Sequence, residues 1–145
     1  MKRSKRLEPV GELADGEERE CAARVAGIQT RLDDAQKRAN ELKRYLVEYQ
    51  SMFQQRGAAG IGVSDLRDYQ TFLARLNDAV RQQEALVSQV ESECARARVE
   101  WLEPAARKTA VGKVIENARS EDRKVEERRS QKETDEHAQR RGGTR

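Results

Sequence analysis

Aromatic and other apolar residues are scarce in this sequence of 145 residues. Only 4% of the residues are aromatic and 36% are hydrophobic, whereas 38% are charged. This is too little apolar material to fill the core of a globular domain. Ala, Glu, Arg, Leu and Gln are abundant, and such a composition favours helices and is typical of coiled coils. The composition therefore predicts an all-α protein without a sizeable globular core.

Residues that commonly carry out catalysis or bind metals are also few. His137 is the single histidine and lies in a polar C-terminal stretch, and the glycines within helical segments stand apart from one another. Cys21 and Cys94 fall at apolar positions of the helical pattern, so we interpret them as reduced thiols that pack in the core. Two cysteines alone cannot form a zinc site. The sequence predicts no enzyme activity, no cofactor and no metal.

Long hydrophobic runs are absent. The segment from Glu8 to Glu20 follows a basic start but contains acidic residues and glycines, where a signal peptide would have an apolar stretch. No segment is apolar enough to predict a transmembrane helix. We therefore expect a cytoplasmic protein that is not inserted into a membrane.

Neither sign of charge dominates the chain. Lys and Arg number 29 and Asp and Glu number 26, and both signs are interspersed along most of the sequence. A pI near 9 and the basic cluster around Lys2 to Arg6 nevertheless support an alternative, a basic coiled coil that binds nucleic acid. Phosphate binding would weaken steeply with salt, whereas docking through aromatic side chains would not.

A first helix is indicated by apolar residues spaced alternately three and four positions apart. They are Val25, Ile28, Leu32, Ala35, Ala39, Leu42, Leu46, Tyr49 and Phe53. The pattern extends toward the N-terminus through Leu7, Val10, Ala14 and Cys21. Glu17 occupies one position of this extension, and the step from Cys21 to Val25 indicates a stutter. We expect this helix over about residues 8–55.

Three glycines within Gly57–Gly62 interrupt the pattern and predict a turn over about residues 56–63. Ser64 is expected to cap the second helix, and Asp65 to place a carboxylate at its positive end. The second helix is expected over about residues 64–130, with a polar tail over about 131–145.

In each helix, the row of mostly apolar residues expected to face the other helix is called its seam. The seam of the second helix keeps its seven-residue spacing past Pro104. At this proline we expect a kink or local loosening, but not an end to the helix. The seam consists of Leu66, Tyr69, Leu73, Leu76, Val80, Gln83, Val87, Val90, Cys94, Ala97, Trp101, Pro104, Lys108, Val111, Ile115, Ala118, Asp122 and Val125.

Two seams joined by a short turn predict a long two-helix antiparallel coiled-coil hairpin, formed as a single domain over residues 1–145. With the turn centred near Gly60, the numbers of facing residues sum to about 120. Leu7 would then face the neighbourhood of Gly112, and residues from about 119 onward would have no partner.

Two aromatic residues, Tyr45 and Phe72, lie just beside the seams. Four pairs of residues there have numbers that sum to 121: Tyr45 with Leu76, Tyr49 with Phe72, Leu42 with Ala79, and Arg38 with Gln83. These eight residues would form two facing rows near the turn. Such aromatic residues either widen the core or serve as a docking surface for another protein, and both interpretations stay open.

Three segments resemble the flagellar export protein family FliJ. The first is Leu42-x-x-Tyr45-x-x-Glu48-Tyr49, and the second is Tyr69-Gln70-x-Phe72-x-x-x-Leu76-x-x-Ala79-Val80-x-Gln82-Gln83. The third is Gln131-Lys132-x-x-Asp135-Glu136-x-Ala138-Gln139-Arg140. Their order and spacing cover nearly the whole chain. His137 and the glycines Gly11, Gly16 and Gly27 depart from the family pattern.

The resemblance implies a non-enzymatic component of the flagellar type III export apparatus, similar to the coiled coil of the rotary ATP synthase γ stalk. It would bind the hexameric export ATPase with its terminal end, and also the FlhA export gate and substrate-free export chaperones, at the cytoplasmic face of the apparatus. No nucleic acid is expected. The gate-binding surface of the family corresponds to Leu42, Tyr45, Tyr49, Phe72, Leu76, Ala79 and Gln83.

Overall fold

The computed structural model describes residues 2–143, and almost all of them are helical. Helix α1 spans Arg3–Gly57 and helix α2 spans Val63–Gly142. No strand occurs within residues 2–143, and none of the helices described has a stretch long and apolar enough to cross a membrane. The two helices pack against each other, so the predicted all-α helical hairpin is confirmed.

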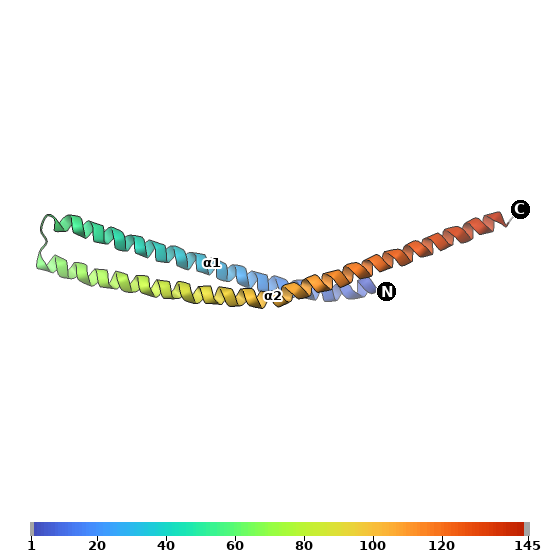
Figure 1. Ribbon diagram of the computed structural model, residues 1–145, viewed down its shortest axis with the longest axis horizontal. Helices are drawn as coiled ribbons and strands as arrows, with labels where there is room; N and C mark the ends of the chain where they lie inside the picture. Colours follow the sequence, from blue (N-terminus) through green and yellow to red (C-terminus); the bar gives the residue numbers. More distant parts are fainter. Residues whose placement is uncertain (1, 144–145) are drawn as a thin grey trace. The chain divides into compact units, whose positions relative to one another are not determined.

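The chain divides into two compact units, and each helix contributes to both. The turn unit comprises Ala23–Val99, and the terminal unit comprises residues up to Ala22 together with those from Glu100 onward. In the turn unit, α1 and α2 lie side by side and are joined at one end by the turn (Figure 1).

The turn unit buries the predicted seam. Ile28 and Leu32 of α1 pack with Val90, Cys94 and Ala97 of α2 in one apolar cluster. Val90 is only 2% exposed. Burying an aliphatic side chain of this size stabilises the fold by about 1.5–3 kcal/mol, so a few such layers hold the two helices together.

The helices of the turn unit are antiparallel. Next to the turn, the rings of Phe53 and Tyr69 stack with centroids 3.5 Å apart, and far from it the Cys94 thiol lies 3.5 Å from the Gln29 side-chain oxygen. The two pairs of residue numbers sum to 122 and 123, close to the expected 120. Cys94 is buried and Cys21 is half-buried, and both are free thiols at seam positions.

The terminal unit has a different register from the one expected. Ser4 bonds to Asp122, and Gly11 lies against Ile115, so these pairs of numbers sum to 126. The expectation that residues from 119 onward lack a partner is therefore wrong, since paired residues continue to Asp122. Packed helices fit the ridges of one into the grooves of the other. This packing does not require the same number of residues along both helices, so the sum of facing residue numbers can change along the hairpin.

The seam of α1 also runs differently in the terminal unit. Val10 is 48% exposed, whereas Gly11 next to it is half-buried. The buried and half-buried positions that continue the alternating spacing are Leu7, Gly11, Ala14, Glu18 and Cys21. This spacing leads into Val25 without a break, so the predicted stutter is wrong. Glycine and glutamate carry no apolar signal, which is why the sequence pattern pointed to Val10 and Glu17 instead.

Glu18 takes a seam position because α2 supplies polar partners for it. The indole Nε1 of Trp101 donates a hydrogen bond to Glu18 Oε1 at 3.2 Å, and Lys108 Nζ lies 3.5 Å from Oε2. The Glu18 side chain is only 15% exposed. Polar residues at seam positions commonly fix the register of paired helices, and this cluster has that arrangement.

The turn between the helices depends on Gly60. It has φ of +90°, a conformation that residues with a Cβ atom rarely adopt. The first amide of α2 to bond along the helix is that of Leu66, which donates to the Gly62 carbonyl at 3.1 Å. Gly62 therefore occupies the capping position expected for Ser64, which lies inside the first turn. Asp65 lies in that first turn as expected.

Both helices are longer than the sequence predicted. α1 begins at Arg3 and not near residue 8, and α2 continues through Pro104 and on to Gly142, where a polar tail was expected from about residue 131. The end of α2 is stabilised locally, for example by the Arg129–Glu133 ion pair at 3.5 Å. Helix formation there follows from intrinsic propensity and not from burial, so the loss of the apolar seam did not mark the end of the helix.

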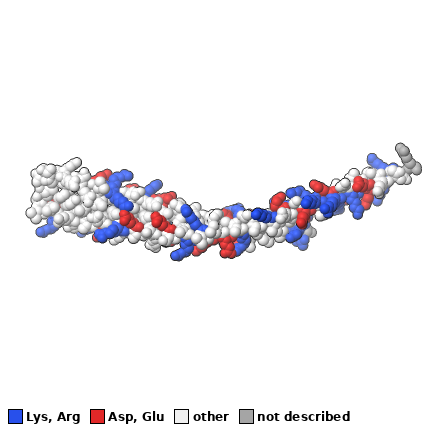
Figure 2. All heavy atoms as spheres, viewed as in Figure 1, with Lys and Arg blue, Asp and Glu red and all other residues white. Residues whose placement is uncertain are grey.

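Charged side chains are distributed unevenly. Figure 2 shows one face, on which few charged residues lie at the end with the turn and both signs alternate over the remainder. No continuous basic stripe crosses this face. A basic stripe on this face would have been the sign of a nucleic-acid-binding surface.

Candidate partner-binding surface

The seven residues selected from the sequence all lie in the turn unit. Leu42, Tyr45 and Tyr49 belong to α1, and Phe72, Leu76, Ala79 and Gln83 belong to α2. We call these seven residues the candidate surface. Tyr45 is 55% exposed and Phe72 is 47% exposed, whereas the other five are half-buried. Two large aromatic side chains thus lie in solvent beside a packed seam.

Tyr49 and Phe72 form the contact that joins the two rows. Their ring centroids are 4.5 Å apart and the ring planes are tilted by 55°. Tilted and edge-to-face arrangements at this distance are favourable for aromatic pairs. The pairing expected from their numbers is therefore present, and Tyr49 holds one side of Phe72 while the other side remains accessible.

Gln83 contributes to the hairpin itself. Its Nε2 donates a hydrogen bond to the backbone carbonyl of Ala35 at 3.0 Å, across the two helices. Arg38, the residue expected opposite Gln83, instead forms an ion pair with Glu41 at 3.7 Å on its own helix. Gln83 therefore links the two helices, and a change at Gln83 would also affect their packing.

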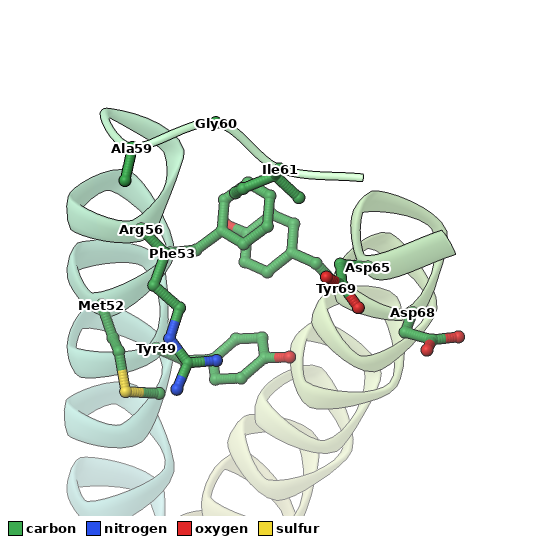
Figure 3. A pocket seen from close by; sticks show the side chains of 10 residues that line it. All are labelled: Tyr49, Met52, Phe53, Arg56, Ala59, Gly60, Ile61, Asp65, Asp68 and Tyr69. Carbon is green, nitrogen blue, oxygen red and sulfur yellow. The ribbon is translucent and has the colours of Figure 1, made fainter. Parts of the chain in front are cut away.

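Sequence reasoning missed a hollow that lies between the candidate surface and the turn. It has a volume of about 440 Å³, and its lining includes side chains from both helices and the turn (Figure 3). Tyr49 lines this hollow as well as belonging to the candidate surface. The other residues that line it are Met52, Phe53, Arg56, Ala59, Gly60, Ile61, Asp65, Asp68 and Tyr69.

The aromatic rings connect the hollow to the candidate surface. Tyr69 stacks on Phe53 at 3.5 Å and on Tyr49 at 5.3 Å, and Tyr49 contacts Phe72. Figure 3 shows the side chains of Tyr49, Phe53 and Tyr69 pointing toward one another from the two helices. The numbers of Phe53 and Tyr69 sum to 122. The expectation that facing residues have numbers summing to about 120, which paired Tyr49 with Phe72, could therefore have identified this pair too.

The rim of the hollow is polar. Arg56 comes from the last turn of α1, and Asp65 and Asp68 come from the start of α2. The apolar centre includes Met52, which is 47% exposed. An apolar, aromatic centre with a charged rim is the usual composition of a protein–protein interface. The geometry is therefore suited to binding a protein surface.

Comparison with known families agrees with this arrangement. The family model described as Flagellar FliJ protein matches residues 3–145, nearly the whole chain. The chain belongs to the FliJ family. The resemblance seen in the three sequence segments is thus confirmed, and this FliJ family member is a component of the flagellar export apparatus, in a family that is non-catalytic. No curated protein and no solved structure matches the chain, so the similarity to the γ stalk stays a prediction.

Proposed function

We propose that this FliJ family protein couples the export ATPase to the FlhA export gate by binding both, and that it also receives substrate-free export chaperones. It would do so at the cytoplasmic face of the export apparatus. The observation that carries the proposal is the exposure of Tyr45 and Phe72 on the surface that the family resemblance assigns to gate binding. Chaperone binding rests on the family resemblance alone.

The gate contact is supported by the presence of both packed and exposed residues on the candidate surface. Tyr49 and Leu76 are half-buried between the helices, whereas about half of the area of Tyr45 and Phe72 is in solvent. Exposed aromatic residues on a rigid helical support lose little conformational entropy when they bind, and they often dominate the binding energy of an interface. Tyr45 and Phe72 would therefore be the principal anchors.

The ATPase contact is assigned to the terminal unit. Here the basic residues near Arg3 and the end of α2 beyond Asp122 are available, and Val125 in that segment is 62% exposed. Exposed charges of both signs along this segment could form polar contacts with different subunits of a ring. The two proposed contacts lie in different units, so they can be tested separately.

The gate contact is tested by replacing the two exposed rings together. In a motile bacterium that lacks its own copy of this protein, the Tyr45→Ala, Phe72→Ala variant should reduce export of flagellar subunits and capture less gate protein in a pull-down. The matched control is Val47→Ala with Val99→Ala, because both valines are exposed in the turn unit and lie outside the candidate surface. Equal export by the two variants would contradict the assignment of the gate contact.

The ATPase contact is tested by a truncation that leaves the paired helices intact. Removing residues from Glu126 onward preserves Asp122 and its bond to Ser4. The truncated protein should no longer stimulate the purified export ATPase, while its affinity for the gate domain should equal that of the full chain. Full stimulation by the truncated protein would show that the end of α2 is not the contact.

A further inference from the structure

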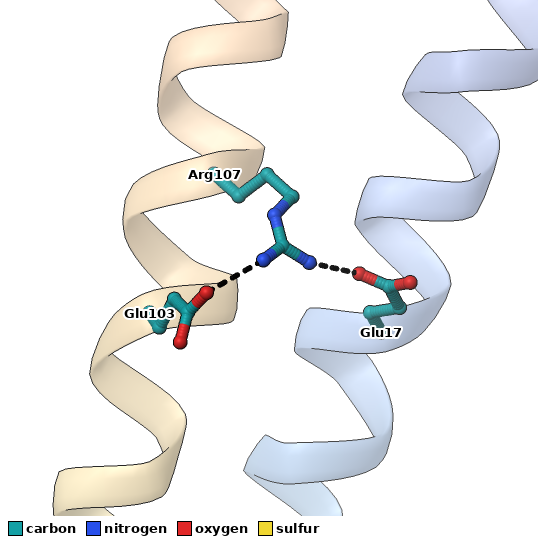
Figure 4. A network of polar contacts seen from close by, with 3 residues as sticks. All are labelled: Glu17, Glu103 and Arg107. Atoms are coloured by element: carbon teal, nitrogen blue, oxygen red, sulfur yellow. Dashed lines mark hydrogen bonds and ion pairs between the residues drawn. The ribbon is translucent and has the colours of Figure 1, made fainter.

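One side of the terminal unit has an apolar centre between two ion pairs. Arg3 of α1 pairs with Glu121 of α2 at 3.8 Å, and Glu17 of α1 pairs with Arg107 of α2 at 2.8 Å. Figure 4 shows Arg107 reaching across to Glu17 while it also contacts Glu103 on its own helix. Both ion pairs cross between the helices, and their members are two heptads apart on each helix, from Arg3 to Glu17 and from Arg107 to Glu121, so the two pairs lie on the same side of the hairpin.

The residues between these ion pairs are apolar and exposed. Val10 lies one heptad after Arg3 and one heptad before Glu17, and Val114 lies midway between Arg107 and Glu121 in the same way. Residues seven positions apart lie on the same side of a helix, so both valines face the side that the ion pairs mark. Val10 is 48% exposed and Val114 is 46% exposed.

Two more apolar residues extend this centre. Leu13, 65% exposed, is one helical turn from Glu17 and from Val10, and Ala110, also exposed, is one turn from Val114. We call Val10, Leu13, Ala110 and Val114 the apolar patch. Large apolar side chains with this exposure, surrounded by charged groups, are typical of interaction sites.

The four ion-paired residues around the apolar patch alternate in sign, so the surface is complementary in charge to a second copy of itself. Along α1 the order is positive at Arg3 and negative at Glu17, and along α2 it is negative at Glu121 and positive at Arg107. The sign is therefore reversed between the two helices and also between the two ends of the patch.

Two copies placed face to face would bring opposite charges together. With a twofold axis parallel to the helices, Arg3 of one copy lies over Glu121 of the other, and Glu17 lies over Arg107. With a twofold axis across the helices, Arg3 lies over Glu17 of the other copy, and Glu121 lies over Arg107. None of these four residues meets a like charge among the four in either arrangement, and the apolar patches meet at the centre.

We propose that this side of the terminal unit is a self-association surface, through which two copies of the chain form a weak and reversible dimer. The four ion-paired residues are exposed, with side-chain exposures between 41% and 67%, and ion pairs of this kind rearrange at little cost. A patch of four small or medium apolar residues is well below the area of a permanent interface, which fits a transient dimer. The surface lies outside the turn unit, so the proposal does not depend on gate binding.

The first test is sedimentation velocity of the full chain over about 10 to 500 µM, a range suited to weak dimers. The wild-type protein should shift from monomer toward dimer. Leu13→Glu should raise the dissociation constant by about tenfold or more, because it places a charge in the apolar centre. The matched control is Leu102→Glu, since Leu102 is 58% exposed in the same unit but is not on the side marked by the ion pairs. Helicity by circular dichroism should be the same for all three proteins.

A charge exchange then separates the two arrangements. The variant Glu17→Lys with Arg107→Glu keeps an ion pair between α1 and α2 but reverses its direction. It should abolish a dimer whose axis crosses the helices, because Arg3 would then face Lys at position 17, and it should leave a dimer whose axis is parallel to the helices unchanged. A wild-type chain that stays monomeric over the whole concentration range would overturn the proposal. An equal rise of the dimer dissociation constant in Leu13→Glu and Leu102→Glu would also overturn it, because the dimer would then form through another surface.

Discussion

The carboxylate of Asp122 on α2 binds the first turn of α1 through Ser4. Its Oδ2 accepts a hydrogen bond from the Ser4 hydroxyl at 2.5 Å and one from the Ser4 amide at 3.3 Å. The first amides of a helix have no partner within the helix, so a carboxylate from the opposite helix satisfies one of them. This contact fixes the start of α1 against α2 and explains why α1 begins at Arg3.

The Asp122 contact should make the terminal unit sensitive to acid. The hydroxyl hydrogen bond from Ser4 is the main cause that lowers the pKa of Asp122, and the Ser4 amide and the charges of Lys2 and Arg3 act in the same direction against partial desolvation. Because the folded-state pKa is below the unfolded value, the stabilisation is present above about pH 4 and is lost as the pH falls through the folded-state pKa.

This dependence is measured by thermal unfolding as a function of pH. Asp122→Asn should lower the melting temperature at neutral pH and should reduce the further loss of stability in acid, since the variant has no carboxylate to protonate. Asp34→Asn provides the control, because Asp34 is exposed and lies in the turn unit. If the two variants have the same pH profile, the Asp122 contact does not stabilise the protein.

Two glycines of α1 should respond differently to replacement by alanine. Nothing lies within 4 Å of a Cβ atom added at Gly16, whereas one added at Gly11 would lie 2.6 Å from Ile115 Cδ1. Gly16→Ala should therefore stabilise the protein by about 1 kcal/mol, the usual gain within a helix. Gly11→Ala should gain less, because the Ile115 side chain must move.

The Gly11 contact can be isolated by a double-mutant cycle measured by chemical unfolding. Ile115→Val removes the Cδ1 atom, so Gly11→Ala should be more stabilising in that background than in the wild type. Additive effects of the two substitutions would mean that the close approach has no energetic consequence.

The apolar cluster of the turn unit should not tolerate charge. Leu32→Asp with Val90→Asp would bury two carboxylates without partners, and each should cost about 3 kcal/mol or more. We expect the double variant to lose most of its helicity at 25 °C by circular dichroism. Val47→Asp should retain the helicity of the wild type, because Val47 is 64% exposed in the same unit. A folded double variant would contradict the assignment of the seam.

The apolar spacing was sufficient to predict the hairpin, because each layer of the turn unit is marked by residues such as Leu32 and Val90. It failed where the seam position is filled by the half-buried residues Gly11 and Glu18, since Gly11 is covered by the Ile115 side chain and Glu18 is held by polar partners. It also failed beyond about residue 130, where the helix continues to Gly142 without an apolar seam. These contacts depend on the opposite helix or on local propensity, and neither leaves an apolar signal in the sequence.

The candidate surface was predictable to a similar extent. The positions of Tyr45 and Phe72 beside the seams followed from the spacing, and the contact of Phe72 with Tyr49 followed from their numbers. The hydrogen bond of Gln83 to the Ala35 carbonyl did not, because it depends on a side-chain conformation. What the surface binds followed from the family resemblance and stays a prediction.

The most direct test of the proposed function is the affinity of the purified gate domain for the full chain, measured by isothermal titration calorimetry. Truncating a large interface aromatic residue often costs about 2 kcal/mol or more, so Tyr45→Ala with Phe72→Ala should weaken binding by well over tenfold. The melting temperature of the variant should stay close to that of the wild type, since about half of the area of each residue is in solvent and neither belongs to the buried cluster. Wild-type affinity in a variant that melts with the wild type would contradict the account, because Tyr45 and Phe72 would then contribute only to packing.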